Sequence, residues 1–246
     1  MEIYIDNKAA PVGFCLRRFL THRLTELILV VCAAACLLKF LSGISFGCLS
    51  WLIFPAGLVL ASVLPSTLRA LKIRQVSSLQ HDLACVLGLH LNHWRYSFLL
   101  LSLTCLVLFP LLMGLFWLLT VFGLTIPLVP VVQKGTWLTW ILYQLLYVAV
   151  AEEIFFRGFI LGNLLRLRPY GFSSCPWRWQ MIVVLISASI FALIHVFLSE
   201  NLLSGLTFFP GLILGWLFVR TRSLLAPILF HALANIFYAL LPLILT

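Results

Sequence analysis

Apolar residues run through this chain in seven long stretches, and short segments rich in charged residues separate them. An α-helix needs about 20 apolar residues to cross the hydrocarbon core of a bilayer. Stretches of roughly this length therefore predict an all-α, polytopic transmembrane helix bundle of about seven spans, within a range of six to eight. The expected spans are residues 24–43, 45–65, 97–122, 137–162, 180–198, 205–219 and 224–244.

One polar segment interrupts this pattern. Residues 66–95 mix basic side chains and histidines with leucines, which predicts one or two amphipathic helices at the membrane interface. A plain basic loop is the alternative. We divide the chain accordingly into N-terminal spans, residues 1–136 with the interfacial segment 66–95, and a C-terminal core, residues 137–246.

Composition agrees with a membrane protein. The chain is 63% hydrophobic and 9% charged, whereas soluble domains carry about 25% charged residues. A net charge of +9 would favour nucleic acid as a partner of a soluble protein. In a membrane protein, Lys and Arg instead mark cytoplasmic loops and attract anionic lipids. We therefore expect the lipid bilayer as a partner and no nucleic acid.

The basic residues also predict an orientation. With the N-terminus in the cytoplasm, every Lys and Arg falls in a cytoplasmic segment except Lys39, Lys134 and Arg157, as the positive-inside rule requires. The loops are short and the chain has no extensions, so we expect an integral multi-pass protein of a prokaryotic cytoplasmic membrane.

Ionisable and amide side chains lie inside three of the expected spans. Glu152 and Glu153 are neighbours in the fourth span, and Arg157 follows Glu153 at i+4, the spacing and order that favour an ion pair on a helix. A charge at the bilayer centre costs about 2.5–3.5 kcal/mol on insertion scales, so such residues usually mark functional sites.

The fifth and seventh spans repeat this i, i+4 spacing. Phe191 precedes His195, and an aromatic ring on that face would limit rotation of the imidazole. His231 precedes Asn235, which presents two polar groups on one side of a helix. A structural role in helix packing explains a lone membrane histidine, but it accounts poorly for two histidines, an amide and a carboxylate on three helices.

This set of side chains suits hydrolysis of a peptide bond. A carboxylate and a histidine can remove a proton from water, and a second histidine with an amide can donate hydrogen bonds to the oxyanion. The same residues offer a metal alternative, since two His and one Glu form some catalytic zinc sites. Glu152, His195 and His231 would then hold the zinc, although the chain has no HExxH motif.

The three motifs resemble the signature motifs of the CAAX-protease and bacteriocin-processing (CPBP) family. These intramembrane endopeptidases include the type II CAAX prenyl endopeptidase. The stretch from Phe209 to Asn235 is similar to the last motif block of that family, and the resemblance covers about residues 137–237.

The resemblance implies a role for each residue. Glu152 would be the general base, His195 would position and activate the water, and His231 and Asn235 would form the oxyanion hole. Glu153, Arg157 and Phe191 would be supporting residues. It also implies a glutamate-type protease that needs no metal cofactor.

We therefore expect an intramembrane endopeptidase that cleaves a membrane-associated peptide or protein during maturation or sorting, with its site in the membrane interior. Two alternatives remain: a non-catalytic bacteriocin-immunity or scaffold member of the same family, and a small proton-coupled transporter. The transporter would predict inverted repeats, and none is visible.

The expected spans also pose a geometric problem. By helical rise, Glu152 lies about 15 Å from the cytoplasmic end of its span, His231 about 10 Å and His195 about 22 Å. These side chains meet only if the helices are tilted or their ends are misplaced by a turn.

Overall fold

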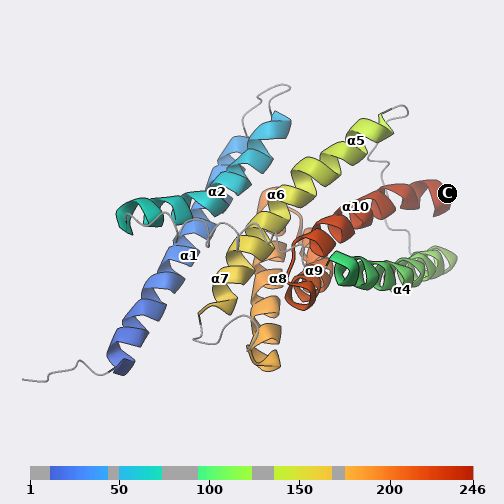
Figure 1. The fold of residues 1–246 in the computed structure, drawn as a ribbon. Helices are drawn as coiled ribbons and strands as arrows, with labels where there is room; N and C mark the ends of the chain where they lie inside the picture. Colours follow the sequence, from blue (N-terminus) through green and yellow to red (C-terminus); the bar gives the residue numbers. More distant parts are fainter. Residues whose placement is uncertain (1–11, 44–49, 74–93, 124–135, 168–174, 246) are drawn as a thin grey trace, which may run out of the picture.

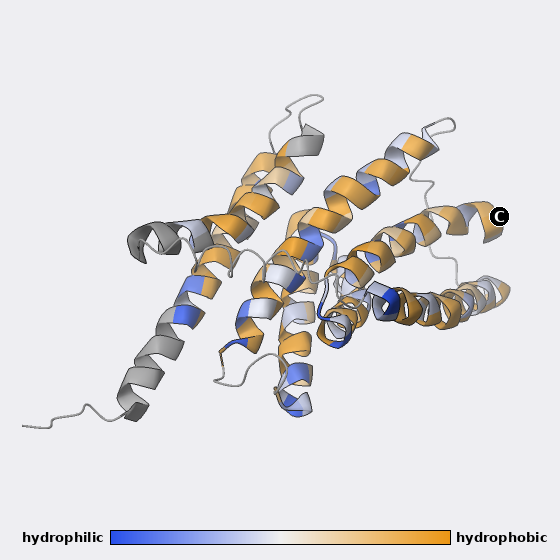
Figure 2. Ribbon diagram, viewed as in Figure 1, coloured by the Kyte–Doolittle hydropathy of each residue, from blue (hydrophilic) through white to orange (hydrophobic). Residues whose placement is uncertain are grey.

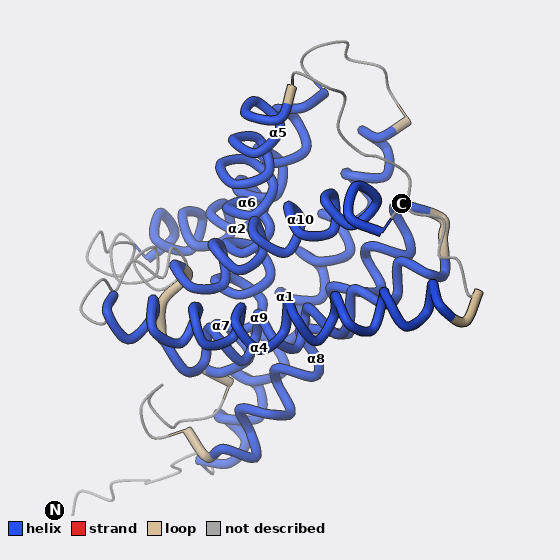
Figure 3. Tube along the Cα trace, turned by 90° about the vertical axis from the view of Figure 1, so that its right-hand side faces the viewer, coloured by secondary structure: helices blue, strands red, loops and turns tan. Residues whose placement is uncertain are grey.

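The structure is a computed structural model that describes residues 12–43, 50–73, 94–123, 136–167 and 175–245. Within these ranges the regular structure is helical throughout (Figure 3). Each expected span corresponds to a helix. The helices are α1 (Val12–Ser42), α2 (Ser50–Ile73), α4 (Trp94–Val121), a composite helix from Trp137 to Leu165, α8 (Trp177–Ser199), η5 (Leu202–Thr207) continued by α9 (Phe208–Thr221), and α10 (Leu225–Leu245).

The prediction of an all-α transmembrane bundle is confirmed. Five helical segments are long and apolar enough to cross a membrane: Arg23–Ser42, Trp94–Val121, Trp177–Ser199, Leu202–Thr221 and Leu225–Ile244. Most of the described residues along these helices are hydrophobic, as the colouring by hydropathy shows (Figure 2). The other two expected spans are α2 and the composite helix. The apolar part of α2, Ile53–Pro65, is shorter than the five spanning segments, and the composite helix carries the buried Glu152, Glu153 and Arg157. The chain is therefore a multi-pass membrane protein.

Two helix boundaries differ from the expected ones. Helix α1 begins at Val12 rather than near residue 24, because no proline interrupts the basic segment that precedes the apolar one. Helix α2 continues through Pro65 to Ile73, since a proline removes one backbone donor without ending a helix whose neighbours compensate. The rest of the predicted interfacial segment, residues 74–93, lies outside the described residues.

The composite helix occupies the centre of the bundle (Figure 1). Helix α2 packs against it from one side, and α8, α9 and α10 contact it from the other. Helices α1 and α2 lie side by side, and α10 also packs on α4 and α9. Figure 1 shows α8 and α10 at clearly different inclinations, so the tilt that the sequence required is present.

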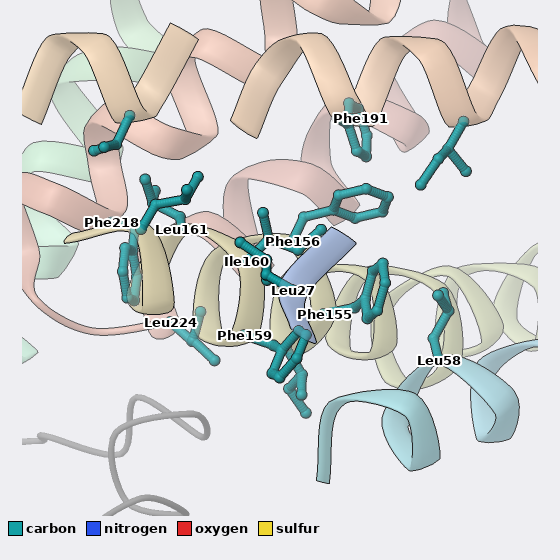
Figure 4. Close-up of a cluster of buried hydrophobic side chains, with 14 of the residues drawn as sticks. Leu27, Leu58, Phe155, Phe156, Phe159, Ile160, Leu161, Phe191, Phe218 and Leu224 are labelled. Carbon is teal, nitrogen blue, oxygen red and sulfur yellow. The ribbon is translucent and has the colours of Figure 1, made fainter. Parts of the chain in front are cut away.

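The core of the bundle is built on one segment of the composite helix. Every residue from Ile154 to Leu161 is buried. Figure 4 shows the rings of Phe155, Phe156 and Phe159 and the neighbouring aliphatic side chains packed between Leu58 of α2 and Phe191 of α8. This apolar packing fixes the turn that precedes it, which carries both glutamates.

Helices α8 and α9 approach each other closely through glycine. A Cβ at Gly211 would lie 3.3 Å from Ala188 and from the ring of Phe191, and one at Gly215 would lie 3.0 Å from Val184. Such close packing is typical of helices with small residues at i and i+4, and here it brings Gly211 against the ring of Phe191.

Candidate active site

The two glutamates occupy a single α-helical turn between two π-helical segments. The turn α6 (Val150–Glu153) follows η3 (Gln144–Ala149) and precedes η4 (Ile154–Leu161), and α5 (Trp137–Tyr143) and α7 (Gly162–Leu165) complete the composite helix. Short π-helical segments within α-helices are frequent at functional sites. Here they change the register of the side chains on both sides of the glutamates.

Glu153 is the centre of a buried network. Its Oε1 atom accepts a hydrogen bond from Arg157 Nη1 at 2.9 Å and a second from His231 Nδ1 at 2.8 Å. Glu153 and Arg157 are both 0% exposed. The ion pair expected from the sequence is therefore present, and it carries a bond to His231 on α10 that helical spacing cannot predict.

Arg157 joins this network to α8 and α9. Its Nη2 atom donates to the carbonyl oxygen of Gly211 at 3.3 Å. Its guanidinium carbon lies 4.6 Å from the centre of the Phe191 ring, within the range of a cation–π contact. Arg157 thus connects the composite helix to α8 and α9.

Glu152 faces both histidines. Its Oε2 atom lies 3.9 Å from His195 Nε2 and 3.9 Å from His231 Nε2, and it has no direct hydrogen-bond partner among the described residues. These gaps are too long for direct hydrogen bonds. Each gap is of the length that a bridging water spans, and the three side chains come from three different helices.

The hydrogen bonds of the two histidines define which nitrogen faces Glu152. His195 Nδ1 donates to the carbonyl oxygen of Phe191 at 2.9 Å, because a carbonyl oxygen only accepts. His231 Nδ1 donates to the Glu153 carboxylate. Both imidazoles therefore turn Nε2 toward Glu152. The Phe191 ring, 4.3 Å from the His195 ring centre, limits rotation of that imidazole as the sequence predicted.

Asn235 lies one turn beyond His231 on α10. Its Nδ2 atom donates to Gln144 Oε1 at 2.8 Å, and an amide nitrogen carries a second hydrogen. Sequence reasoning missed Gln144, although a polar side chain in the apolar run from Trp137 to Ala149 was the signal that could have identified it. The structure brings the side chains of Glu152, His195 and His231 close together. It links Asn235 to Gln144, which lies on the composite helix eight residues before Glu152.

The zinc alternative requires Glu152, His195 and His231 to converge on one ion. Among the described residues, no group of three His, Cys, Asp or Glu side chains has an arrangement that could hold a metal ion. The Nδ1 atoms of the two imidazoles are instead engaged by the Phe191 carbonyl oxygen and the Glu153 carboxylate.

A cavity of about 280 Å³ adjoins Glu152 and His195. It lies between α1, α2, the composite helix and α8. Its other lining residues are Leu38, Ser42, Phe54, Leu58, Phe156, Ile194, Leu198 and Ser199. The predicted general base therefore borders a mostly apolar space rather than closely packed protein.

Comparison with known protein families gives one match. Residues 133–237 match the family model described as "Type II CAAX prenyl endopeptidase Rce1-like", a family of proteases. No curated protein and no solved structure matches the chain. The matched residues include both glutamates, both histidines and Asn235, and the buried Glu/His cluster is consistent with an active site. The chain therefore contains an Rce1-like domain of the type II CAAX prenyl endopeptidase (CPBP) family.

Proposed function

We propose that this protein is an intramembrane endopeptidase that hydrolyses a peptide bond of a membrane-associated peptide or protein with a water activated by Glu152. The observation that carries the proposal is the position of Glu152 Oε2, which is 3.9 Å from the Nε2 atoms of both His195 and His231. A water that bridges Glu152 and either histidine at this separation lies within hydrogen-bond distance of the carboxylate, as general-base catalysis requires.

The proposed reaction begins with this water. Its oxygen attacks the carbonyl carbon of the substrate while Glu152 takes its proton, and His195 Nε2 accepts the other hydrogen and orients the lone pair. The carbon–nitrogen bond then breaks, and Glu152 returns the proton to the leaving amine. No covalent intermediate with the enzyme forms, so a single carboxylate acts first as base and then as acid.

Negative charge develops on the substrate carbonyl oxygen during the attack. We assign its stabilisation to His231 and Asn235. A protonated His231 donates from Nε2 while Glu153 balances its charge through Nδ1. Asn235 donates the amide hydrogen that Gln144 does not hold. Such donors lower the barrier because they are already oriented before charge develops.

The proposal also includes a division of the chain and a cellular location. We place the catalytic unit in residues 137–246 and the N-terminal spans, residues 1–136, beside it. The distribution of the basic residues supports a cytoplasmic N-terminus, and we propose the cytoplasmic membrane of a prokaryote as the location. A maturation or sorting reaction on a peptide held at the cytoplasmic membrane suits a site inside the bilayer.

Purified protein in detergent tests the proposal. We expect it to cleave members of a library of apolar peptides, detected by mass spectrometry, and we expect Glu152→Gln to lower the rate by about 10²–10⁴-fold. Glu200→Gln is the matched control, because its side chain is 76% exposed and lies outside the cluster. Absence of cleavage by the wild-type protein, or equal rates for Glu152→Gln and wild type, contradicts the proposal.

A further inference from the structure

The cavity beside Glu152 and His195 has two walls of different origin. Phe156, Ile194 and Leu198 come from the composite helix and α8, within residues 133–237. Leu38 and Ser42 come from α1, and Phe54 and Leu58 from α2. Half of the apolar wall thus lies outside the part of the chain that matches the family model.

The chemistry of the lining selects an uncharged occupant. Apart from Glu152 and His195, the lining consists of apolar side chains and the hydroxyl groups of Ser42 and Ser199. A cationic group there could pair only with Glu152 and would block the general base, and an anionic group would face that carboxylate; both would lose their hydration. An aliphatic or aromatic group would gain about 25 cal/mol for each Å² of apolar surface buried.

The size and position of the cavity restrict the occupant further. Its volume of about 280 Å³ is at the lower end of ligand pockets, which span roughly 300–1,000 Å³. Because Glu152 and His195 line it, whatever fills it lies directly beside the bond that the activated water attacks. A side chain of the substrate residue next to that bond satisfies both conditions.

Resting on the proposed function, we infer that this cavity is the specificity pocket for an apolar side chain, of the size of leucine to phenylalanine, adjacent to the scissile bond. Phe54 and Leu58 of α2, with Leu38 of α1, determine which side chain enters. The N-terminal helices therefore set substrate selectivity, while the Rce1-like domain supplies the chemistry.

Leu58 and Phe54 offer opposite perturbations. Leu58 is 2% exposed, so Leu58→Phe narrows the pocket. Phe54 is only partly buried, so Phe54→Ala enlarges it with little risk to folding. Leu60, on the same helix, is 61% exposed and does not line the cavity, so Leu60→Phe adds the same atoms outside the pocket and is the matched control.

The assay compares kcat/KM for synthetic peptides that differ only at the residue beside the cleaved bond, with Ala, Leu, Phe, Trp or Lys there. One methylene in an apolar pocket is worth about 10–200-fold. We expect wild type to prefer Leu or Phe over Ala by at least about tenfold and to reject Lys. Leu58→Phe should lose this preference while it retains cleavage of the Ala peptide, and Phe54→Ala should gain activity on the Trp peptide.

The possible outcomes separate the two proposals. If wild type cleaves no peptide, the proposed function fails and this inference fails with it. If wild type cleaves and Glu152→Gln does not, but Leu58→Phe and Phe54→Ala leave the preference unchanged, the pocket assignment alone is wrong. An equal shift in Leu60→Phe also overturns the assignment. If Leu58→Phe does not fold, as judged by size-exclusion chromatography, Phe54→Ala decides.

Discussion

Replacement of Arg157 by methionine should destabilise the protein far more than loss of its visible hydrogen bonds suggests. Arg157 Nη1 lies 2.9 Å from Glu153 Oε1, and both residues are fully buried. Removal of one partner of a buried ion pair costs about 3–5 kcal/mol, because the other charge remains in the interior without compensation. The unfolding equilibrium should therefore shift by about two to three and a half powers of ten.

A double variant separates this charge effect from lost packing. Glu153→Gln combined with Arg157→Met leaves no uncompensated charge, so it should recover most of the stability that Arg157→Met alone loses. It should remain inactive, because His231 Nδ1 then donates to an amide rather than to a carboxylate. The second substitution would thus restore stability without restoring activity.

Unfolding in mixed micelles with increasing SDS, followed by circular dichroism, measures all four members of this cycle. The exposed pair Lys39–Glu200 supplies the control cycle, with Lys39→Met and Glu200→Gln, and should show near-additive effects. Our account of the cluster fails if Arg157→Met is as stable as wild type. It also fails if the Glu153/Arg157 cycle is additive.

Three further predictions concern single features. Asn235→Ala should lower kcat by about 10²–10³-fold with little change in KM. Gln144→Leu should lower kcat less, since the Asn235 amide remains but loses its orientation. If steady-state kinetics shows that both variants change only KM, Asn235 does not stabilise the oxyanion. The hydrogen bond from Lys39 lowers the pKa of Glu200, so the ion pair contributes stability at neutral pH that is lost as the pH falls below about 4.3, the ordinary glutamate value. Between pH 7 and pH 3 the melting temperature should therefore fall less for Glu200→Gln than for wild type. An equal fall for both proteins would contradict this contribution of the ion pair. Cleavage should persist after dialysis against EDTA, because Glu152 acts on water directly. If dialysis abolishes cleavage and added zinc restores it, the site is a zinc site instead.

The sequence predicted the helices and singled out the residues of the Glu/His cluster, because both depend on local signals. Apolar stretches of membrane length mark the spans, and ionisable residues within them stand out energetically. Helical spacing also predicted the Glu153–Arg157 pair. It could not predict that His231 binds the same carboxylate oxygen, because that contact joins residues 78 positions apart and depends on how α10 crosses the composite helix.

Two other features had weak or no sequence signals. Gln144 is uncharged, so its cost in a membrane span is modest and it attracts less attention than a glutamate. The π-helical segments around Val150–Glu153 depend on packing against α2, α8 and α10 rather than on a residue pattern. The boundaries of α1 and α2 were placed too narrowly, because loss of hydrophobicity marks the end of a membrane span and not the end of a helix.

Gly211 shows how a residue without a side chain can hold a buried polar cluster in place. Its carbonyl oxygen accepts from Arg157, while its missing Cβ leaves room for Phe191, whose ring adjoins Arg157 and His195. Even a single methyl group there would press on Ala188 and on the Phe191 ring of α8. A substitution at this glycine would therefore disturb the Glu/His cluster from a position that belongs to the packing of the bundle.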